Sequence, residues 1–187
     1  MRYSEDHKAQ THQRIVKEAS ERFRRDGIGA TGLQPLMKAL GLTHGGFYAH
    51  FKSKDDLVEQ SLRKAADDLA DHCNNLFAEE SPLVAFIDSY LSSEHRASPD
   101  KGCPLPTMSA ELGQRGQASP TTDEVIQSRL KSIENTLPDQ TRAREQSIVM
   151  LSTLVGALLL SRSANDPELS DQILDTTREW LKQQATA

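Results

Sequence analysis

Apolar residues recur every three or four positions along almost the whole chain, which is the spacing of amphipathic helices. In the first such segment Ile15, Val16, Ala19 and Phe23 fall on one stripe, and Gly27 follows where a helix commonly ends. No alternating run of apolar and polar residues, the mark of a β-strand, persists anywhere. We therefore expect an all-α protein of about nine helices.

Cap residues and prolines set the expected helix boundaries. Thr31–Gln34 has the form of a capping box, and Thr43 and Ser53 are residues that favour helix N-termini. Three further helices are expected to open at Ser-Pro or Asp-Pro pairs. The expected helices are 6–26, 33–40, 44–50, 54–77, 82–91, 107–113, 120–136, 138–163 and 167–184.

The second and third expected helices carry the functional signal. They are short and are joined by the three-residue turn Gly41-Leu42-Thr43, which is helix-turn-helix spacing. A small core would hold the third helix at a fixed angle with its polar N-terminus outward, as a helix that enters the DNA major groove requires. The expected members of this core are Phe23, Leu36, Leu40, Leu42, Phe47 and Phe51.

The net charge of −5 conceals an asymmetry along the chain. Residues 1–54 contain ten Lys+Arg and five Asp+Glu, whereas the other 133 residues contain twelve and twenty-two. Four of the six histidines also lie in the first part. A basic N-terminal part followed by an acidic remainder indicates a polyanionic partner for residues 1–54. The alternative is that charged residues are distributed unevenly along the chain without functional meaning.

The helix-turn-helix region resembles the signature of TetR-family transcriptional regulators. The matching residues lie in register over about a third of the chain, and two positions depart from the usual pattern: Leu36-Met37 replaces Ile-Ala, and Gly46 stands where Thr or Ser is common. The resemblance implies a DNA-binding domain in residues 1–54 and a helical ligand-sensing and dimerisation domain in residues 55–187. The matching residues are Gly27, Ala30-Thr31, Leu33, Leu36, Ala39, Gly41-Leu42-Thr43, Gly45, Phe47-Tyr48, His50-Phe51, Ser53-Lys54-Asp55 and Leu57.

The resemblance and the chemistry of the side chains together predict the DNA contacts. His44 is the expected base reader, and Gly45 and Gly46 would allow the backbone to approach the duplex closely. Lys54 would bind a phosphate at a helix N-terminus, where the helix dipole adds to its charge. The remaining predicted contacts, mostly to the DNA backbone, are Thr31, Gln34, Thr43, Tyr48 and His50.

The C-terminal half predicts a homodimer. The run Ile148–Leu160 is apolar almost all round, and the closing helix adds Leu169 and Trp180, which is more apolar surface than one small bundle readily buries. TetR-like proteins dimerise through their last two long helices, so the resemblance agrees. The alternative is that these residues form the core of a monomer.

The body between the two ends is expected to hold a sensor site for a small-molecule or electrophile inducer. Cys103 lies in a proline-rich break after Lys101-Gly102 and before a short helix, a setting that lowers thiol pKa values. The segment Gly102–Leu112 resembles a branch of TetR-like repressors that includes the repressor of N-ethylmaleimide reductase, whose matching cysteine senses electrophiles. In other relatives that cysteine is only a packed residue. The further expected sensing residues are His72, Cys73, Phe77, Phe86, Tyr90 and Met108.

We therefore predict a cytoplasmic, homodimeric repressor that an inducer releases from a palindromic operator. The polar N-terminus has no signal-peptide core, and no unbroken apolar run of membrane-span length occurs. Two cysteines cannot form a disulfide framework or a cysteine zinc site, and no nucleotide or metal motif predicts a cofactor or a metal. A helical adaptor without DNA binding is the alternative function, and a small helical enzyme a remoter one.

Overall fold

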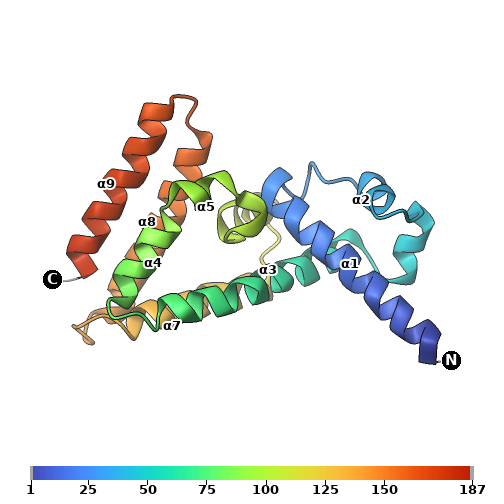
Figure 1. Ribbon diagram of the computed structural model, residues 1–187, viewed down its shortest axis with the longest axis horizontal. Coiled ribbons are helices and arrows are strands. Elements are labelled where there is room, and N and C mark those ends of the chain that lie inside the picture. The colour runs from blue at the N-terminus through green and yellow to red at the C-terminus, as the bar shows by residue number, and fades with distance from the viewer. Residues whose placement is uncertain (1, 186–187) are drawn as a thin grey trace. The chain divides into compact units, whose positions relative to one another are not determined.

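The computed structural model describes residues 2–185, and all the regular secondary structure there is helical (Figure 1). The prediction of an all-α protein with about nine helices is confirmed for these residues, which also contain two 3-10 helices and one π-helix, labelled η; the helix expected at 44–50 is one of the 3-10 helices. The elements are α1 (Arg2–Asp26), α2 (Leu33–Ala39), η1 (His44–Ala49), α3 (Lys54–Leu76), α4 (Pro82–Tyr90), α5 (Ser93–Ala97), η2 (Pro99–Lys101), η3 (Leu105–Ser109), α6 (Ala110–Gln114), α7 (Pro120–Glu134), α8 (Ala143–Ser163) and α9 (Pro167–Ala185).

The chain packs as two compact units. Unit 1 consists of residues 1–67 and 99–121, and unit 2 of residues 68–98 and 122–187. The long helix α3 contributes to both units, and a segment from the middle of the chain belongs with the N-terminal helices. This packing division differs from the boundary after residue 54 that the sequence suggests.

Several helix boundaries follow from the predicted local signals. Gly27 and Gly41 adopt positive φ values of 90° and 72°, which favour glycine and end α1 and α2. The Thr43 side chain accepts a hydrogen bond from the backbone N–H of Gly46 and so caps η1. Ser53 accepts one from the N–H of Asp56 at the start of α3. The capping box at Thr31 is wrong, because Gly32 is the N-cap of α2 and the Thr31 hydroxyl donates to the Gly27 carbonyl instead.

Other boundaries depart from the expected ones. The helix expected from residue 138 begins at Ala143, because Asp139 closes a turn by accepting hydrogen bonds from the N–H and hydroxyl of Thr141. The helix expected at 107–113 is a π turn, η3, followed by the five-residue α6. The short elements α5 and η2 were not expected at all.

Unit 1 is built around one hydrophobic core beneath the helix-turn-helix. Phe23, Leu36, Phe47 and Phe51 are buried as predicted, and Leu40 and Leu42 pack against them partly buried. Met108 and Leu112, from the segment that follows η2, also enter this core. Their sequence distance from the helix-turn-helix conceals this contact.

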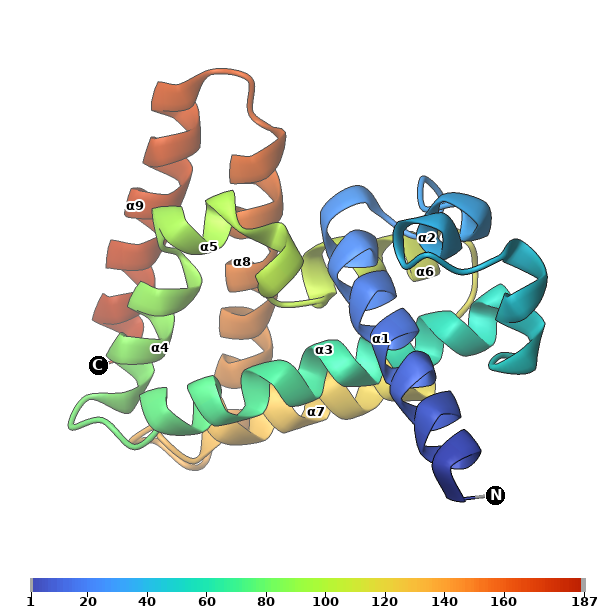
Figure 2. The same ribbon diagram turned by 45° about the vertical axis from the view of Figure 1, so that its right-hand side comes forward.

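In unit 2 the helices α8 and α9 form an antiparallel pair with α4 beside them (Figures 1 and 2). The apolar side chains Leu154, Leu158 and Leu181 of this pair are fully buried, and Leu174 is nearly so. By length and composition α8 is apolar enough to cross a membrane, but the core helix of a soluble protein passes the same test.

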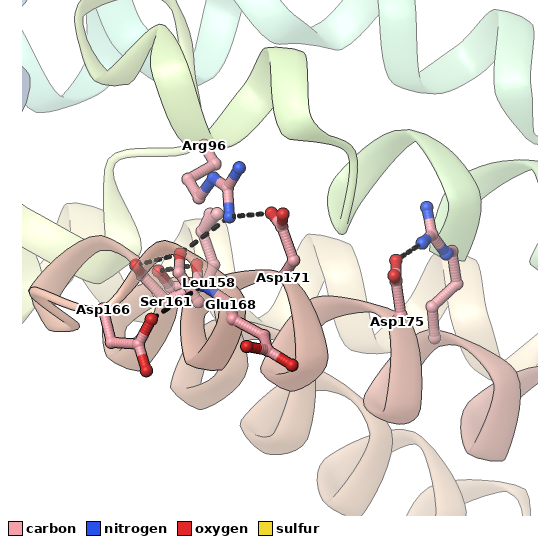
Figure 3. Close-up of polar contacts among 9 residues, drawn as sticks. Arg96, Leu158, Ser161, Asp166, Glu168, Asp171 and Asp175 are labelled. Carbon is pink, nitrogen blue, oxygen red and sulfur yellow. Dashed lines mark hydrogen bonds and ion pairs between the residues drawn. The ribbon is translucent and has the colours of Figure 1, made fainter.

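Hydrogen bonds and an ion pair connect α5 to the turn between α8 and α9 within unit 2 (Figure 3). The Arg96 guanidinium donates to the Ser170 hydroxyl and pairs with Asp171, both at 2.7 Å. Ser170 in turn donates to the carbonyl of Ser161 at 2.6 Å. Because Ser161 and Ser170 are both buried, this hydrogen bond joins the end of α8 to the start of α9 without an unsatisfied group at either oxygen.

Candidate nucleic-acid interface

The turn η1 presents two polar aromatic side chains to solvent. His44 is exposed and Tyr48 is 63% exposed, and their ring centroids lie 6.1 Å apart with the rings edge to face. Thr43 and Gly45 are also exposed, so the N-terminal end of η1 offers a small polar surface. The predicted base reader, His44, and the predicted phosphate contact, Tyr48, are thus accessible together.

Buried rings hold this surface in place. Phe47, between His44 and Tyr48 in the sequence, is fully buried and stacks on Phe51 with centroids 5.2 Å apart. The Tyr48 ring meets Phe47 edge-on at 5.2 Å. Because Phe47 is locked in the core, the neighbouring exposed side chains start from a fixed backbone, as sequence-specific recognition requires.

His50 has a less accessible environment than His44. Its ring is half-buried, and burial is the main cause that lowers its pKa, with nearby His12 and Lys8 lowering the pKa further. His12 itself stacks on Phe51 at 4.5 Å, and its Nε2 lies 2.7 Å from the Gln60 side-chain oxygen. In the free protein the His50 ring is therefore a weaker base than a fully exposed histidine.

Lys54 and Thr31 act within the protein. The Lys54 ammonium donates to the carbonyls of Ile28 at 2.5 Å and Thr31 at 2.7 Å, and burial is the first cause that lowers its pKa. The Thr31 side chain is buried. The phosphate contacts predicted for Lys54 and Thr31 stay predictions, and the structure gives both residues a role in supporting the loop between α1 and α2. Gln34 is exposed on α2.

The seven predicted sensing residues fall in different packing units. Cys103, 6% exposed, and Met108, fully buried, belong to unit 1. Phe77, Phe86 and Tyr90 form an aromatic row in unit 2, with centroids 4.9 and 5.7 Å apart. The same unit contains His72 and Cys73, and His72 is exposed with its Nε2 3.1 Å from the Ser89 hydroxyl. Their sensing role stays a prediction.

The contact between the segment 99–121 and the helix-turn-helix unit was not predicted from the sequence. Arg24 of α1 is buried and donates to the carbonyl of Gly102 at 3.1 Å. Arg24 itself could have indicated this contact. It directly follows Phe23 of the inward-facing stripe, and a charged side chain that is buried there needs a polar partner.

Comparisons with known proteins agree with this geometry. Residues 15–60 match the family model described as bacterial regulatory proteins of the tetR family. The uncharacterized HTH-type transcriptional regulator Rv0196 of Mycobacterium tuberculosis is 26% identical over 170 residues, which are 82% of this chain and 85% of that protein.

Solved structures share the fold along nearly the whole chain. A TetR transcriptional regulator from Chloroflexus aurantiacus has a TM-score of 0.74 at 21% identity and covers 98% of both chains. The reduced form of E. coli NemR has a TM-score of 0.73 at 17% identity, covering 93% of this chain and 96% of that one. At these identities the likeness is one of fold, so the branch suggested by the Cys103 segment stays a prediction.

The match over residues 15–60 assigns this part of the chain to the DNA-binding domain of the tetR family. Along most of its length the chain is similar to an HTH-type transcriptional regulator, and it has the fold of TetR transcriptional regulators.

Proposed function

We propose that this regulator is a homodimeric repressor that reads a palindromic operator with the His44–Tyr48 surface of each subunit. The observation that carries the proposal is the pairing of two exposed polar rings with the fully buried Phe47 between them. Repression is the expected output because a dimer bound to its operator blocks access of the polymerase without any activating contact.

Within this surface the side chains have different chemistry toward DNA. A ring nitrogen of His44 can hydrogen-bond a base edge in the major groove, which supplies discrimination between sequences. The hydroxyls of Thr43 and Tyr48, the Gln34 amide and His50 would contact sugar–phosphate, which supplies affinity and sensitivity to salt. Gly45 and Gly46 have no side chain, so the backbone of η1 could approach the DNA closely at these two residues.

Dimerisation is supported by apolar side chains that unit 2 leaves uncovered. On α8 and α9 these exposed residues are Ile148, Val149, Leu159, Leu160, Leu169 and Trp180. Six exposed apolar residues on two adjacent helices indicate a protein partner. A second copy of the same helix pair would present a matching apolar surface. Two reading heads would then engage half-sites roughly 34–36 Å apart, or a multiple of that spacing.

A small-molecule or electrophile inducer would release the operator. It must bind one conformer of the protein better than the other, because only a difference in affinity shifts the equilibrium. Cys103 is the proposed target of an electrophile, and its burial requires local opening before reaction. Unchanged release of DNA by N-ethylmaleimide after Cys103→Ser would reject this route and leave a non-covalent inducer. We place the protein in the cytoplasm, where its DNA target lies.

The direct test is selection of DNA from a random 40-base-pair duplex library by the purified full-length protein. We expect enrichment of one inverted repeat, protection of both half-sites in footprinting, and binding that weakens steeply with salt. Enrichment of no sequence would contradict DNA recognition and favour a helical adaptor. An enriched site without two-fold symmetry would contradict the dimeric arrangement.

A further inference from the structure

The loop between α1 and α2, residues 27–32, sets where the helix-turn-helix begins. It leaves α1 through Gly27 at φ 90° and enters α2 at Leu33. Such a loop has few backbone partners of its own, so its course depends on what satisfies its N–H and carbonyl groups. In this chain side chains from two distant elements satisfy them.

Glu111 of α6 binds the loop from one side. One carboxylate oxygen accepts the N–H of Ile28 at 2.5 Å, and the other accepts the N–H of Gly29 at 2.6 Å. Arg115, one turn along α6, donates to the same carboxylate at 2.5 Å. Hydrogen bonds to a carboxylate are short and stronger than those between neutral groups, so this two-point contact fixes both the position and the orientation of the loop.

Lys54 binds the same loop from the carbonyl side. Its ammonium donates to Ile28 and Thr31, so the N–H of Ile28 is held by an anion and its carbonyl by a cation. The Thr31 hydroxyl adds an internal bond to the Gly27 carbonyl at 2.8 Å. We call this set of contacts the loop clamp: Glu111, Lys54 and the loop 27–32.

The loop glycines leave room for the Glu111 carboxylate. A Cβ added to Gly29 would lie 2.7 Å from one carboxylate oxygen, and one added to Gly27 would lie 3.1 Å from the other. Contacts under 3.0 Å are closer than carbon and oxygen tolerate, so a side chain at Gly29 would displace the carboxylate. The absence of a side chain at residue 29 is therefore part of the clamp.

The segment that carries Glu111 is itself anchored to unit 1. Arg24 holds the Gly102 carbonyl, and Met108 and Leu112 are buried in the core beneath the helix-turn-helix. In Figure 2 the short helix α6 lies beside α1 and α2, as these contacts require. A movement of this segment would therefore reach the loop directly through Glu111.

We propose that Glu111 is a positioning residue for DNA binding. Its carboxylate sets the course of the loop and thereby the placement of α2 and η1 on α1, so its loss weakens DNA binding without removing any contact to DNA. The proposal rests on the DNA-binding function proposed above, and it makes residues 99–121 the part of the chain on which a competent helix-turn-helix depends.

The test compares Glu111→Ala and the milder Glu111→Gln with the wild-type protein, using the duplex that the wild type selects from the random library. Loss of two bonds to a charged acceptor predicts affinity about 10- to 100-fold lower for Glu111→Ala. Amide hydrogen exchange of Ile28 and Gly29 should accelerate by a similar factor or more in both variants, with and without DNA. Gln114→Ala, on the exposed side of the same helix, is the matched control and should change neither.

A double-mutant cycle with Gly29→Ala separates positioning from a general loss of stability. Gly29→Ala should weaken DNA binding in the wild-type background, where the new Cβ meets the carboxylate. It should have little further effect in Glu111→Ala, where the carboxylate is gone and only the flexible end of Arg115, 3.0 Å from the added Cβ, has to move. Additive losses, or unchanged affinity and exchange in Glu111→Ala, would overturn the proposal. If the wild type itself selects no duplex, the proposed function fails as well, and the wild-type result alone identifies that case.

Discussion

At the residue scale, side chains with opposite roles lie next to each other in the helix-turn-helix. His44 and Tyr48 are exposed, whereas Phe47 between them has no accessible surface. Lys54 and Thr31 direct their polar atoms to backbone carbonyls of the loop 27–32. The proposed DNA contacts and the support of the loop are therefore divided among residues that the sequence resemblance groups together.

Replacing His44 by Ala should reduce discrimination more than general affinity. A bidentate contact to a base edge contributes about 1–3 kcal/mol, so loss of the single His44 contact, at the lower end of this range, should weaken binding to the selected duplex about 5- to 10-fold. Binding to an unrelated duplex should change little. Fluorescence anisotropy with both duplexes measures this, with His72→Ala, an exposed histidine of unit 2, as the control. Equal losses on both duplexes would assign His44 to phosphate contact instead.

Tyr48→Phe should weaken binding to every duplex by a similar factor. The substitution removes only the hydroxyl from a ring that is 63% exposed, so the core beneath it is unchanged. Phosphate contacts carry no direct sequence information, and each contributes to affinity rather than specificity. Parallel anisotropy titrations on the selected and unrelated duplexes test this prediction, and a loss confined to the selected duplex would contradict it.

His95, in unit 2, should make the fold sensitive to acid. Its Nδ1 lies 2.7 Å from the Tyr90 carbonyl, so the neutral ring carries its proton there, and burial lowers the pKa to about 4. Because the pKa is lower in the folded state, the unfolded state binds the proton first as pH falls. The contribution of His95 to the free energy of unfolding is therefore complete above about pH 6.5. It falls by about 3 kcal/mol as the pH is lowered from about 6.5 to 4.

The variant His95→Asn keeps a donor for the Tyr90 carbonyl but cannot be protonated. Urea unfolding of wild type and variant at pH 7 and pH 4 should show a smaller loss of stability on acidification in the variant. Equal losses would show that other groups cause the acid sensitivity. His7→Ala, which removes an exposed histidine of α1, is the control, because the charge of His72 itself contributes to the lowered pKa of His95.

At the scale of the element, η1 combines a side-chain cap with two glycines. A Cβ at Gly45 meets nothing within 4 Å, and one at Gly46 meets Thr43 Oγ1 at 3.4 Å, an ordinary contact. Neither glycine has a positive φ. The fold of the isolated protein therefore tolerates alanine at both positions, and their presence needs another explanation.

Gly45→Ala is expected to separate folding from DNA binding. Alanine reduces the freedom of the unfolded chain, so the free energy of unfolding should stay unchanged or rise by up to about 1 kcal/mol. Affinity for the selected duplex should fall, because the new methyl group occupies the point where the backbone approaches DNA. Thermal unfolding and anisotropy together test this, and undiminished affinity would show that no close approach occurs at Gly45.

At the scale of the whole molecule, the uncovered apolar residues of α8 and α9 should set the oligomeric state. Leu160→Glu places a charge on a side chain that is 60% exposed, so it costs the isolated subunit little. Inside a dimer interface the same charge would be buried without a partner. Sedimentation should show wild-type dimers and variant monomers, and the monomers should lose cooperative binding to the inverted repeat.

The matched control for the dimer is Lys131→Glu, which changes an exposed residue of α7. It should remain dimeric with full DNA affinity. A Leu160→Glu protein that stays dimeric would place the interface elsewhere, and a wild type that is monomeric at micromolar concentration would contradict the proposed assembly.

The sequence by itself determined where most helices lie, and it predicted the helix-turn-helix that we propose reads DNA. Helical periodicity, Gly27 and Gly41 at the ends of helices, and the Thr43 cap are local signals, and the structure reproduces each of them. The exposure of His44 and Tyr48 around the buried Phe47 follows from the same local pattern. The starts of α6 and α8 were displaced because the Asp139 turn and the π turn before Ala110 compete with the helix there.

Only the tertiary structure showed which distant residues support the helix-turn-helix. Glu111 meets the amide of Ile28 across 83 positions, and Arg24 meets the Gly102 carbonyl across 78. No periodicity or cap relates residues so far apart, and the polar partner of a buried charge can come from any part of the chain. The segment 99–121 lies with the helix-turn-helix because Met108 and Leu112 share its core and because these hydrogen bonds join the two parts.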